Sequence, residues 1–151
     1  MNQWLLRPLL ASDLGHVKQI DRASFSPQEQ YDDAVYALMP QSGRGLVAQN
    51  TSGLIVGYVF IHPSESPHPN GDAFGNVRSI AVHPDHRHRG YGKALLEAAI
   101  AQSDGDIDLF VDEDNESAIK LYESLGFRPA EMRPAEPSGR RMVRSRYHPE
   151  Q

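Results

Sequence analysis

The chain contains no cysteine and no long apolar run, and each absence excludes a class of protein. Without cysteine there is no disulfide scaffold, no Cys-based zinc site and no cysteine nucleophile. The most apolar stretch, 54–61, is broken by Gly57 and is far too short to span a bilayer. No basic segment followed by an apolar one is visible at the N-terminus, so the sequence shows no signal peptide. We expect a cytoplasmic protein that does not bind membranes.

Basic residues are also outnumbered, with 15 Lys and Arg against 20 Asp and Glu, which gives a net charge of −5. Proteins that coat nucleic acids are usually basic, so we expect no nucleic-acid partner. An acidic surface suits cationic ligands such as amines better. A nucleic-acid binder would have to use scattered arginines, which are Arg87, Arg89, Arg140, Arg141, Arg144 and Arg146.

The length of 151 residues suits one domain, 1–151, with its own core. Apolar spacing and turn residues predict the order β-α-α-β-β-β-α-β-α-β-β, an α+β or mixed α/β fold around one sheet. Pro40 and Gly43 should stop the second helix, and 62–72 should be an exposed loop. The expected strands are 5–6, 45–48, 54–61, 77–82, 107–111, a strand from 127 and 141–147, and the expected helices are 12–23, 28–39, 90–102 and 115–125.

The turn that follows strand 77–82 is the most informative segment. Gly90 and Gly92 lie at the start of a helix, where backbone N–H groups are unpaired and the helix dipole is positive. Arg87, Arg89 and Lys93 lie beside them in an otherwise acidic chain. This pattern favours an anion such as a pyrophosphate. The alternative is that the glycines only allow tight helix packing and the basic residues form a solvated face.

Three histidines in the same segment raise the question of a metal. His83, His86 and His88 are close in sequence, and Asp85 is the only acid among them. Structural zinc sites favour other spacings, so we expect no metal ion.

Two blocks of the sequence together resemble the GNAT acetyltransferases. The acetyl-CoA signature of that family is Gln or Arg, two residues, Gly, one residue, and Gly or Ala, and residues 87–92 read RHRGYG. The second block, 115–127, reads NESAIKLYESLGF, with Asn, Ala, Leu-Tyr and Gly-Phe at the family's usual spacing. The resemblance covers about 77–128. It implies the GNAT-type fold, a mixed, mostly antiparallel sheet flanked by helices.

The resemblance also implies an activity, the transfer of an acetyl group from acetyl-CoA to a primary amine. The amine attacks the thioester directly, so no protein nucleophile is needed. The acceptor, a small molecule or a protein amine, is left open, and a homodimer is possible. The residues that the resemblance assigns to acetyl-CoA are Ile80, Ala81 and Val82 for the pantetheine arm, Arg87, His88, Arg89, Gly90, Tyr91, Gly92 and Lys93 for the pyrophosphate, and Asn115 for the arm.

Tyr122 matches the family position that protonates the departing thiolate. A phenol with a pKa of about 10 stays protonated at neutral pH and can protonate a thiolate whose parent thiol has a pKa of about 8.5. The alternative is a core tyrosine beside Leu121 and Leu125 on the buried side of the helix.

The general base cannot be assigned from the sequence. Family members often place a glutamate on the strand before the turn, but the matching positions hold Asn76 and Arg78. Asp112, Glu113, His83 or water could carry the amine proton instead. The missing carboxylate motivates a second hypothesis, a non-catalytic module that binds acyl-CoA.

Overall fold

The computed structural model describes residues 4–24, 33–41, 45–63, 74–102, 106–111, 114–129 and 140–144. They fall into two compact units, one within Met1–Ile61 and Arg78–Gln102 and the other within His62–Val77 and Ser103–Gln151. Strand β4, Phe74–Val82, contributes its first half to the second unit and its second half to the first. One domain over 1–151 stays a prediction.

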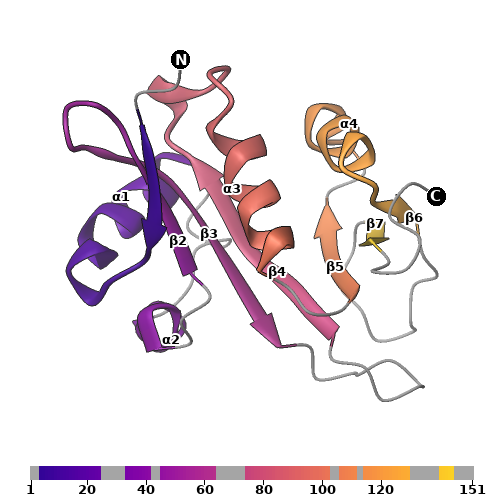
Figure 1. The fold of residues 1–151 in the computed structure, drawn as a ribbon, viewed down its shortest axis with the longest axis horizontal. Helices are drawn as coiled ribbons and strands as arrows, with labels where there is room; N and C mark the ends of the chain where they lie inside the picture. The colour runs from indigo at the N-terminus through magenta and orange to yellow at the C-terminus, as the bar shows by residue number, and fades with distance from the viewer. Residues whose placement is uncertain are drawn as a thin grey trace. The chain divides into compact units, whose positions relative to one another are not determined.

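The first unit is built on antiparallel strands with helices on both faces (Figure 1). Strand β2 lies between β1 and β3, with Leu6 opposite Ala48 and Val47 opposite Tyr58. Two short 3-10 turns, η1 and η3, precede α1 and α3. The elements are β1 Leu5–Pro8, η1 Ala11–Asp13, α1 Leu14–Ser24, α2 Asp33–Gln41, β2 Gly45–Gln49, β3 Ile55–Pro63, η3 Pro84–His86 and α3 Tyr91–Ala101.

Helices α1 and α2 cover one face of these strands because their apolar residues recur at helical spacing. Val17 and Ile20 of α1 and Met39 of α2 are buried in one cluster with Tyr58 and Ala81 from the strands. Burying such side chains contributes about 1.5–3 kcal/mol each, which holds the two helices in place.

Helix α3 packs on the other face through Leu95, Leu96 and Ala99, all buried. Gly57 of β3 allows this approach, since a Cβ there would lie 3.1 Å from the carbonyl oxygen of Ala81 and 3.2 Å from Leu95. The glycine therefore lets α3 lie close to the strand that leads into the phosphate turn.

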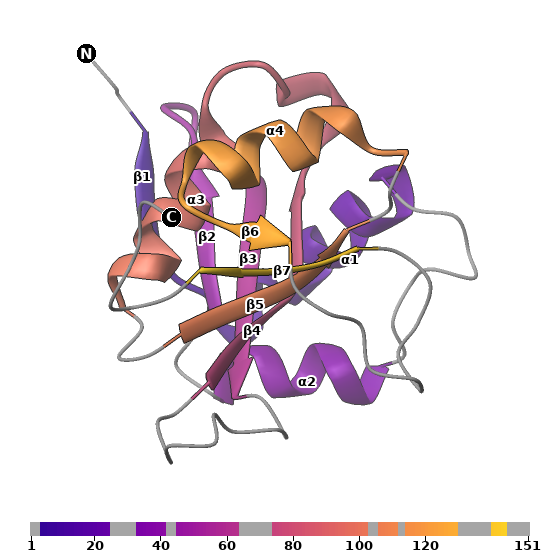
Figure 2. The same ribbon diagram turned by 90° about the vertical axis from the view of Figure 1, so that its right-hand side faces the viewer.

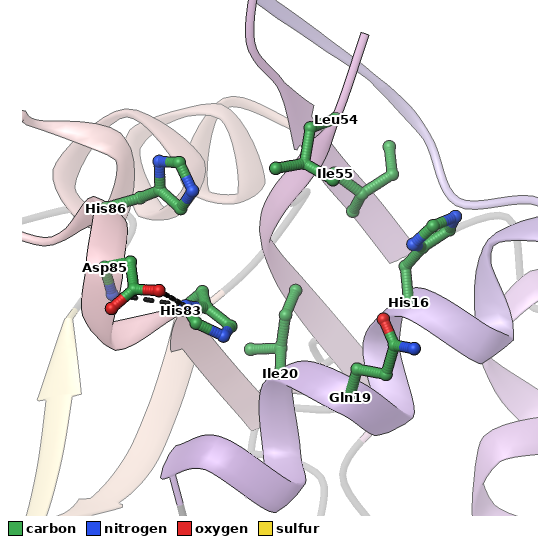
Figure 3. A pocket seen from close by; sticks show the side chains of 8 residues that line it. All are labelled: His16, Gln19, Ile20, Leu54, Ile55, His83, Asp85 and His86. Carbon is green, nitrogen blue, oxygen red and sulfur yellow. Dashed lines mark hydrogen bonds and ion pairs between the residues drawn. The ribbon is translucent and has the colours of Figure 1, made fainter. Parts of the chain in front are cut away.

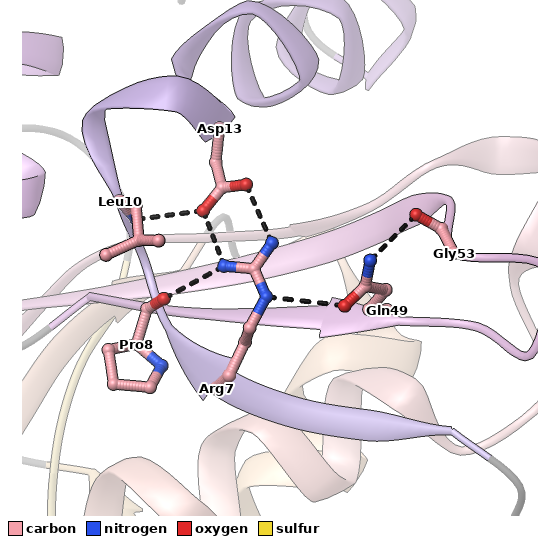
Figure 4. A network of polar contacts seen from close by, with 6 residues as sticks. All are labelled: Arg7, Pro8, Leu10, Asp13, Gln49 and Gly53. Atoms are coloured by element: carbon pink, nitrogen blue, oxygen red, sulfur yellow. Dashed lines mark hydrogen bonds and ion pairs between the residues drawn. The ribbon is translucent and has the colours of Figure 1, made fainter.

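An ion pair joins β1 to η1 at the entrance to α1 (Figure 4). The guanidinium of Arg7 donates to both carboxylate oxygens of Asp13 at 2.8 and 2.9 Å. The backbone N–H of Leu10 also donates to Asp13 at 2.8 Å. Asp13 is buried, and the hydrogen bonds from Arg7 lower the pKa of its carboxyl. This pair fixes the angle at which the chain enters α1.

In the second unit, the first half of β4 runs parallel to β5, with Asn76 opposite Asp108. Figure 2 shows β5, β7 and β6 side by side, with β7 in the middle and antiparallel to each of the other two. Alternate residues of β5, Ile107 and Leu109, are buried with Met142. The elements are β5 Asp106–Val111, α4 Glu116–Ser124, β6 Arg128–Pro129 and β7 Arg140–Arg144.

The predicted order of helices and strands and the mixed α+β class are confirmed by the structure. One boundary was wrong, because Pro40 lies inside the last turn of α2 instead of stopping it. Proline lacks the N–H that would bond four residues back, and the helix continues only to Gln41. The loop expected at 62–72 was wrong at its start, because His62 and Pro63 belong to β3. The predicted strand from Phe127 begins one residue later, at Arg128. The rest of that loop, 64–72, the helix residues 28–32 and the strand residues 145–147 lie outside the described residues. In the part of the chain that the structure describes, no helix is long and apolar enough to cross a membrane.

Candidate functional site

The turn between β4 and α3 has the backbone geometry of an anion site. Two of its residues are left-handed, His88 with φ 65° and Gly90 with φ 89°. Gly90 is the N-cap of α3, and no side chain caps the helix there. The first N–H groups of α3 therefore keep no side-chain partner at the cap, which is the arrangement that a phosphate uses. Left-handed residues in a turn also direct successive N–H groups into one concavity.

The charges of the turn face solvent. Arg87, His88, Arg89 and Lys93 are all exposed. The Nε of Arg87 donates to the carbonyl of Val82 at 3.0 Å, which holds the start of the turn to the end of β4. Lys93 lies 4.0 Å from Glu97, one helical turn on, an exposed pair that contributes little. The cationic groups are thus available to an anion that approaches from solvent.

Tyr91 and Gly92 contribute to the turn in a different way. The Tyr91 ring is buried and lies edge-on to Trp4 at 4.6 Å between ring centroids. Gly92 lies against Val82, where a Cβ would come within 3.8 Å of the valine side chain. At these two positions a ligand would meet the backbone, because the tyrosine side chain is turned into the core.

The strand that leads to the turn holds Ile80 and Val82 half-buried and Ala81 buried. Its end is tied to β3, since the backbone N–H of His83 donates to the carbonyl of Val56 at 2.8 Å. Val77, Ser79 and Ala81 alternate along β4 and share its buried side. The three residues assigned to the pantetheine arm therefore lie on a firmly held strand.

The second unit carries the other two predicted site residues, Asn115 at the N-cap of α4 and Tyr122 within the helix. The side-chain oxygen of Asn115 accepts a hydrogen bond from the N–H of Ala118 at 3.2 Å, so Asn115 caps the start of α4. Its amide nitrogen can still donate to a ligand. Tyr122 is 9% exposed and lies edge-on to Phe127. Burial raises the pKa of its phenol, which keeps the proton on the oxygen at neutral pH.

Of the three side chains considered as the general base, His83 alone lies among the described residues. His83 uses its Nδ1 to accept the backbone N–H of Asp85 at 3.2 Å. Asp112 and Glu113 lie outside the described residues. Asn76 donates through its side-chain amide to Asp108 at 2.8 Å, and Asp108 is buried. Sequence reasoning did not single out Asp108, although a charged residue among the apolar ones of a strand was visible.

A second group that sequence reasoning missed lies in the first unit. Asp21 of α1 is fully buried and accepts hydrogen bonds from Tyr36 at 2.6 Å and Tyr58 at 2.8 Å. Tyr58 is also bonded to Ser79 of β4 at 2.5 Å. Burial raises the pKa of the Asp21 carboxyl, although both tyrosines oppose that change. The only sequence signal was Ser79 itself, a polar residue on the buried face of a strand.

A pocket of about 230 Å³ opens between α1, the start of β3 and η3 (Figure 3). Ile20 and Ile55 form its apolar side, while His16, His83 and His86 line it from α1 and η3. Among the described residues, no group of three or more His, Asp or Glu side chains is placed to hold a metal ion.

Comparison with known proteins assigns the fold. The crystal structure of the NatC complex bound to Gag peptide and CoA matches with a TM-score of 0.80 and 22% identity, over 95% of this chain and 98% of that one. That of Arabidopsis thaliana NAA60 in complex with acetyl-CoA matches with a TM-score of 0.80 and 21% identity, over 94% of this chain and 99% of that one. The fold is that of the N-acetyltransferases.

The model of the Acetyltransferase (GNAT) family matches residues 12–127, and the chain belongs to this family. Two mycothiol acetyltransferases are similar in sequence. That of Paenarthrobacter aurescens is 41% identical over 54% of this chain, and that of an Arthrobacter species is 33% identical over 75% of it. The chain spans only 26% and 33% of the length of these two relatives. The predicted family is confirmed.

Proposed function

We propose that the protein is an N-acetyltransferase that moves an acetyl group from acetyl-CoA to a primary amine. The observation that carries the proposal is the start of α3, where left-handed Gly90 leaves the helix uncapped beside exposed Arg87 and Arg89. A helix end of this kind binds the pyrophosphate of CoA through backbone N–H groups and nearby cations. Membership of the acetyltransferase family supports the same cosubstrate.

The remaining roles follow from the chemistry of each residue. Backbone groups of Ile80, Ala81 and Val82 pair with the pantetheine arm as an added strand would. Asn115 donates to the arm through its free amide nitrogen. Tyr122, whose raised pKa keeps it protonated, gives its proton to the departing thiolate. Acetyl-CoA is consumed as a cosubstrate, and no metal is required.

The acceptor is a primary amine whose class, small molecule or protein, the proposal leaves open. The two relatives are named mycothiol acetyltransferases, but the chain spans only 26% and 33% of their length. A homodimer and a cytoplasmic location stay predictions from the sequence.

The experiment is an assay of thiol release from acetyl-CoA with a panel of amines, with the acetylated product identified by mass. Tyr122→Phe should lower kcat by about 100-fold, the usual contribution of a general acid, and leave the affinity for acetyl-CoA unchanged. Binding of CoA without any amine-dependent thiol release would instead support the alternative, a non-catalytic acyl-CoA-binding module.

A further inference from the structure

A buried chain of hydrogen bonds connects β4 to α1. The hydroxyl of Tyr58 lies 2.5 Å from the Oγ of Ser79 and 2.8 Å from Oδ1 of Asp21. Asp21 and Tyr58 are fully buried, and Ser79 is 6% exposed. Their surroundings are apolar, with Ile20 next to Asp21 in the core cluster. A buried carboxylate costs several kcal/mol of solvation, so its presence in this core suggests a role beyond packing.

The donor and acceptor of each of these hydrogen bonds can be assigned. An ionised carboxylate can only accept hydrogen bonds, so Tyr58 uses its single proton to donate to Asp21. The Tyr58 oxygen can then only accept from Ser79, which makes the serine hydroxyl the donor. The Oγ of Ser79 keeps lone pairs for a further donor. Each proton therefore points toward Asp21, and the open end of the chain is Ser79.

That open end lies beside the residues assigned to the cosubstrate. Ser79 directly precedes Ile80, Ala81 and Val82 on β4. Its side chain projects to the face covered by α1 and α2, as its bond to Tyr58 shows. An arm bound along the edge of a strand can be reached from either face of the sheet. A proton path through Ser79 requires the amine to approach from the α1 side, within reach of the Ser79 oxygen.

We propose that this series of hydrogen bonds, from Ser79 through Tyr58 to Asp21, carries the proton away from the amine, with Asp21 as the final acceptor. The inference rests on the proposed function. As the amine nitrogen loses its proton to Ser79 Oγ, the serine proton passes to Tyr58, and the tyrosine proton passes to Asp21 Oδ1. The neutral nitrogen then attacks the thioester carbon while Asp21 holds the first proton. As the C–S bond breaks, the thiolate takes the proton of Tyr122, and the second proton of the nitrogen restores the phenol. The proton returns to solvent along the same chain after the product leaves.

The groups around Asp21 supply a matched control. Tyr36 of α2 donates to the other carboxylate oxygen at 2.6 Å and does not lie between Ser79 and Asp21. Lys18 of α1 lies over the Tyr36 ring, 5.4 Å from its centroid. Tyr36→Phe and Tyr58→Phe each remove one phenol hydroxyl that donates to Asp21. Only the second breaks the path.

The test compares the two variants in the acetyl-transfer assay. Tyr58→Phe should lower kcat for an alkyl amine by about 100-fold or more, as expected for loss of general base catalysis. Tyr36→Phe should lose less than about 10-fold, the worth of one ordinary hydrogen bond. Acetyl-CoA affinity should be the same in both variants and in the wild type. Ser79→Ala should match Tyr58→Phe.

A weakly basic aromatic amine, already neutral at pH 7, separates proton transfer from structural damage. It does not have to lose a proton before it attacks, so wild type and Tyr58→Phe should acetylate it at similar rates. The path is disproved if the two tyrosine variants lose equally, or if Tyr58→Phe loses as much with the neutral amine. A wild type that acetylates no amine at all would refute the proposed function and the path together, whereas an active wild type with equal variants refutes the path alone.

Discussion

Two buried aspartates near the two ends of α1 have opposite chemical character. Asp13, before the helix, is bonded twice to the guanidinium of Arg7, and its pKa is lowered. Asp21, in the last half of the helix, is bonded to the hydroxyls of Tyr36 and Tyr58, and burial raises its pKa. Asp13 therefore holds its negative charge, whereas the Asp21 carboxyl takes up a proton more easily.

The difference shows what decides the role of a buried acid. A cation supplies an opposite charge that holds the carboxylate ionised, which suits a structural link between β1 and α1. Hydroxyl groups satisfy its hydrogen bonds without supplying a full charge, so the cost of desolvation remains. Burial alone does not distinguish a structural acid from a functional one. The groups that bond to the carboxylate do.

The largest expected difference between the two sites is in activity. Asp21→Asn should lower kcat with an alkyl amine by about 100-fold, because an amide cannot take up the proton. Asp13→Asn should leave kcat per folded molecule unchanged, since the Asp13 carboxylate is bonded to Arg7 and Leu10 and lies outside the proposed site. Amine acetylation at pH 7, corrected for the folded fraction, measures both. Equal losses would remove the distinction between the two acids.

Stability should show the reverse ranking. Asp13→Asn places an amide N–H against the Arg7 guanidinium and should lower the free energy of unfolding by about 2–3 kcal/mol. Asp21→Asn removes a buried charge while an amide can still bond both tyrosines, so the change should stay within about 1 kcal/mol. Urea unfolding at pH 7 gives both values. A larger loss for Asp21→Asn would indicate a mainly structural network.

The smallest effect, and the most specific, is the pH dependence of the change in unfolding free energy that each substitution causes. Asp13 has a lowered pKa, so its contribution is present above about pH 3.9, the unfolded value, and disappears as the pH falls through the folded pKa. Asp21 has a raised pKa, so its contribution is complete below about pH 3.9 and disappears as the pH rises through the folded pKa. Wild type minus variant unfolding energies, measured from pH 3 to 8, should therefore slope in opposite directions. Parallel slopes would contradict the assignment.

Local sequence signals predicted much of the fold and part of the site. Gly90 at the start of α3 depends on a few adjacent residues, and it is found as predicted. The family and the order of elements were predicted from the same local motifs. Pro40 was misjudged because a proline is tolerated one residue before a helix ends.

The hydrogen-bond network could not be predicted in the same way. Asp21, Tyr58 and Ser79 are separated by 37 and 21 positions in the chain, and they meet only after α1 packs on β3 and β4. Asp21 follows Ile20 at the edge of an amphipathic stripe, where an aspartate normally faces water. Long-range packing, and not local propensity, therefore decides that it is buried.

The most direct test of the account is where CoA binds, followed by amide NMR of the labelled protein. Addition of CoA should shift the amide signals of Gly90, Gly92 and Lys93 at the start of α3. Pantetheine, which lacks the diphosphate, should leave these signals in place even at concentrations that perturb Ile80 to Val82. If CoA shifts amides elsewhere and leaves the α3 turn unchanged, the proposed acetyl-CoA site is wrong.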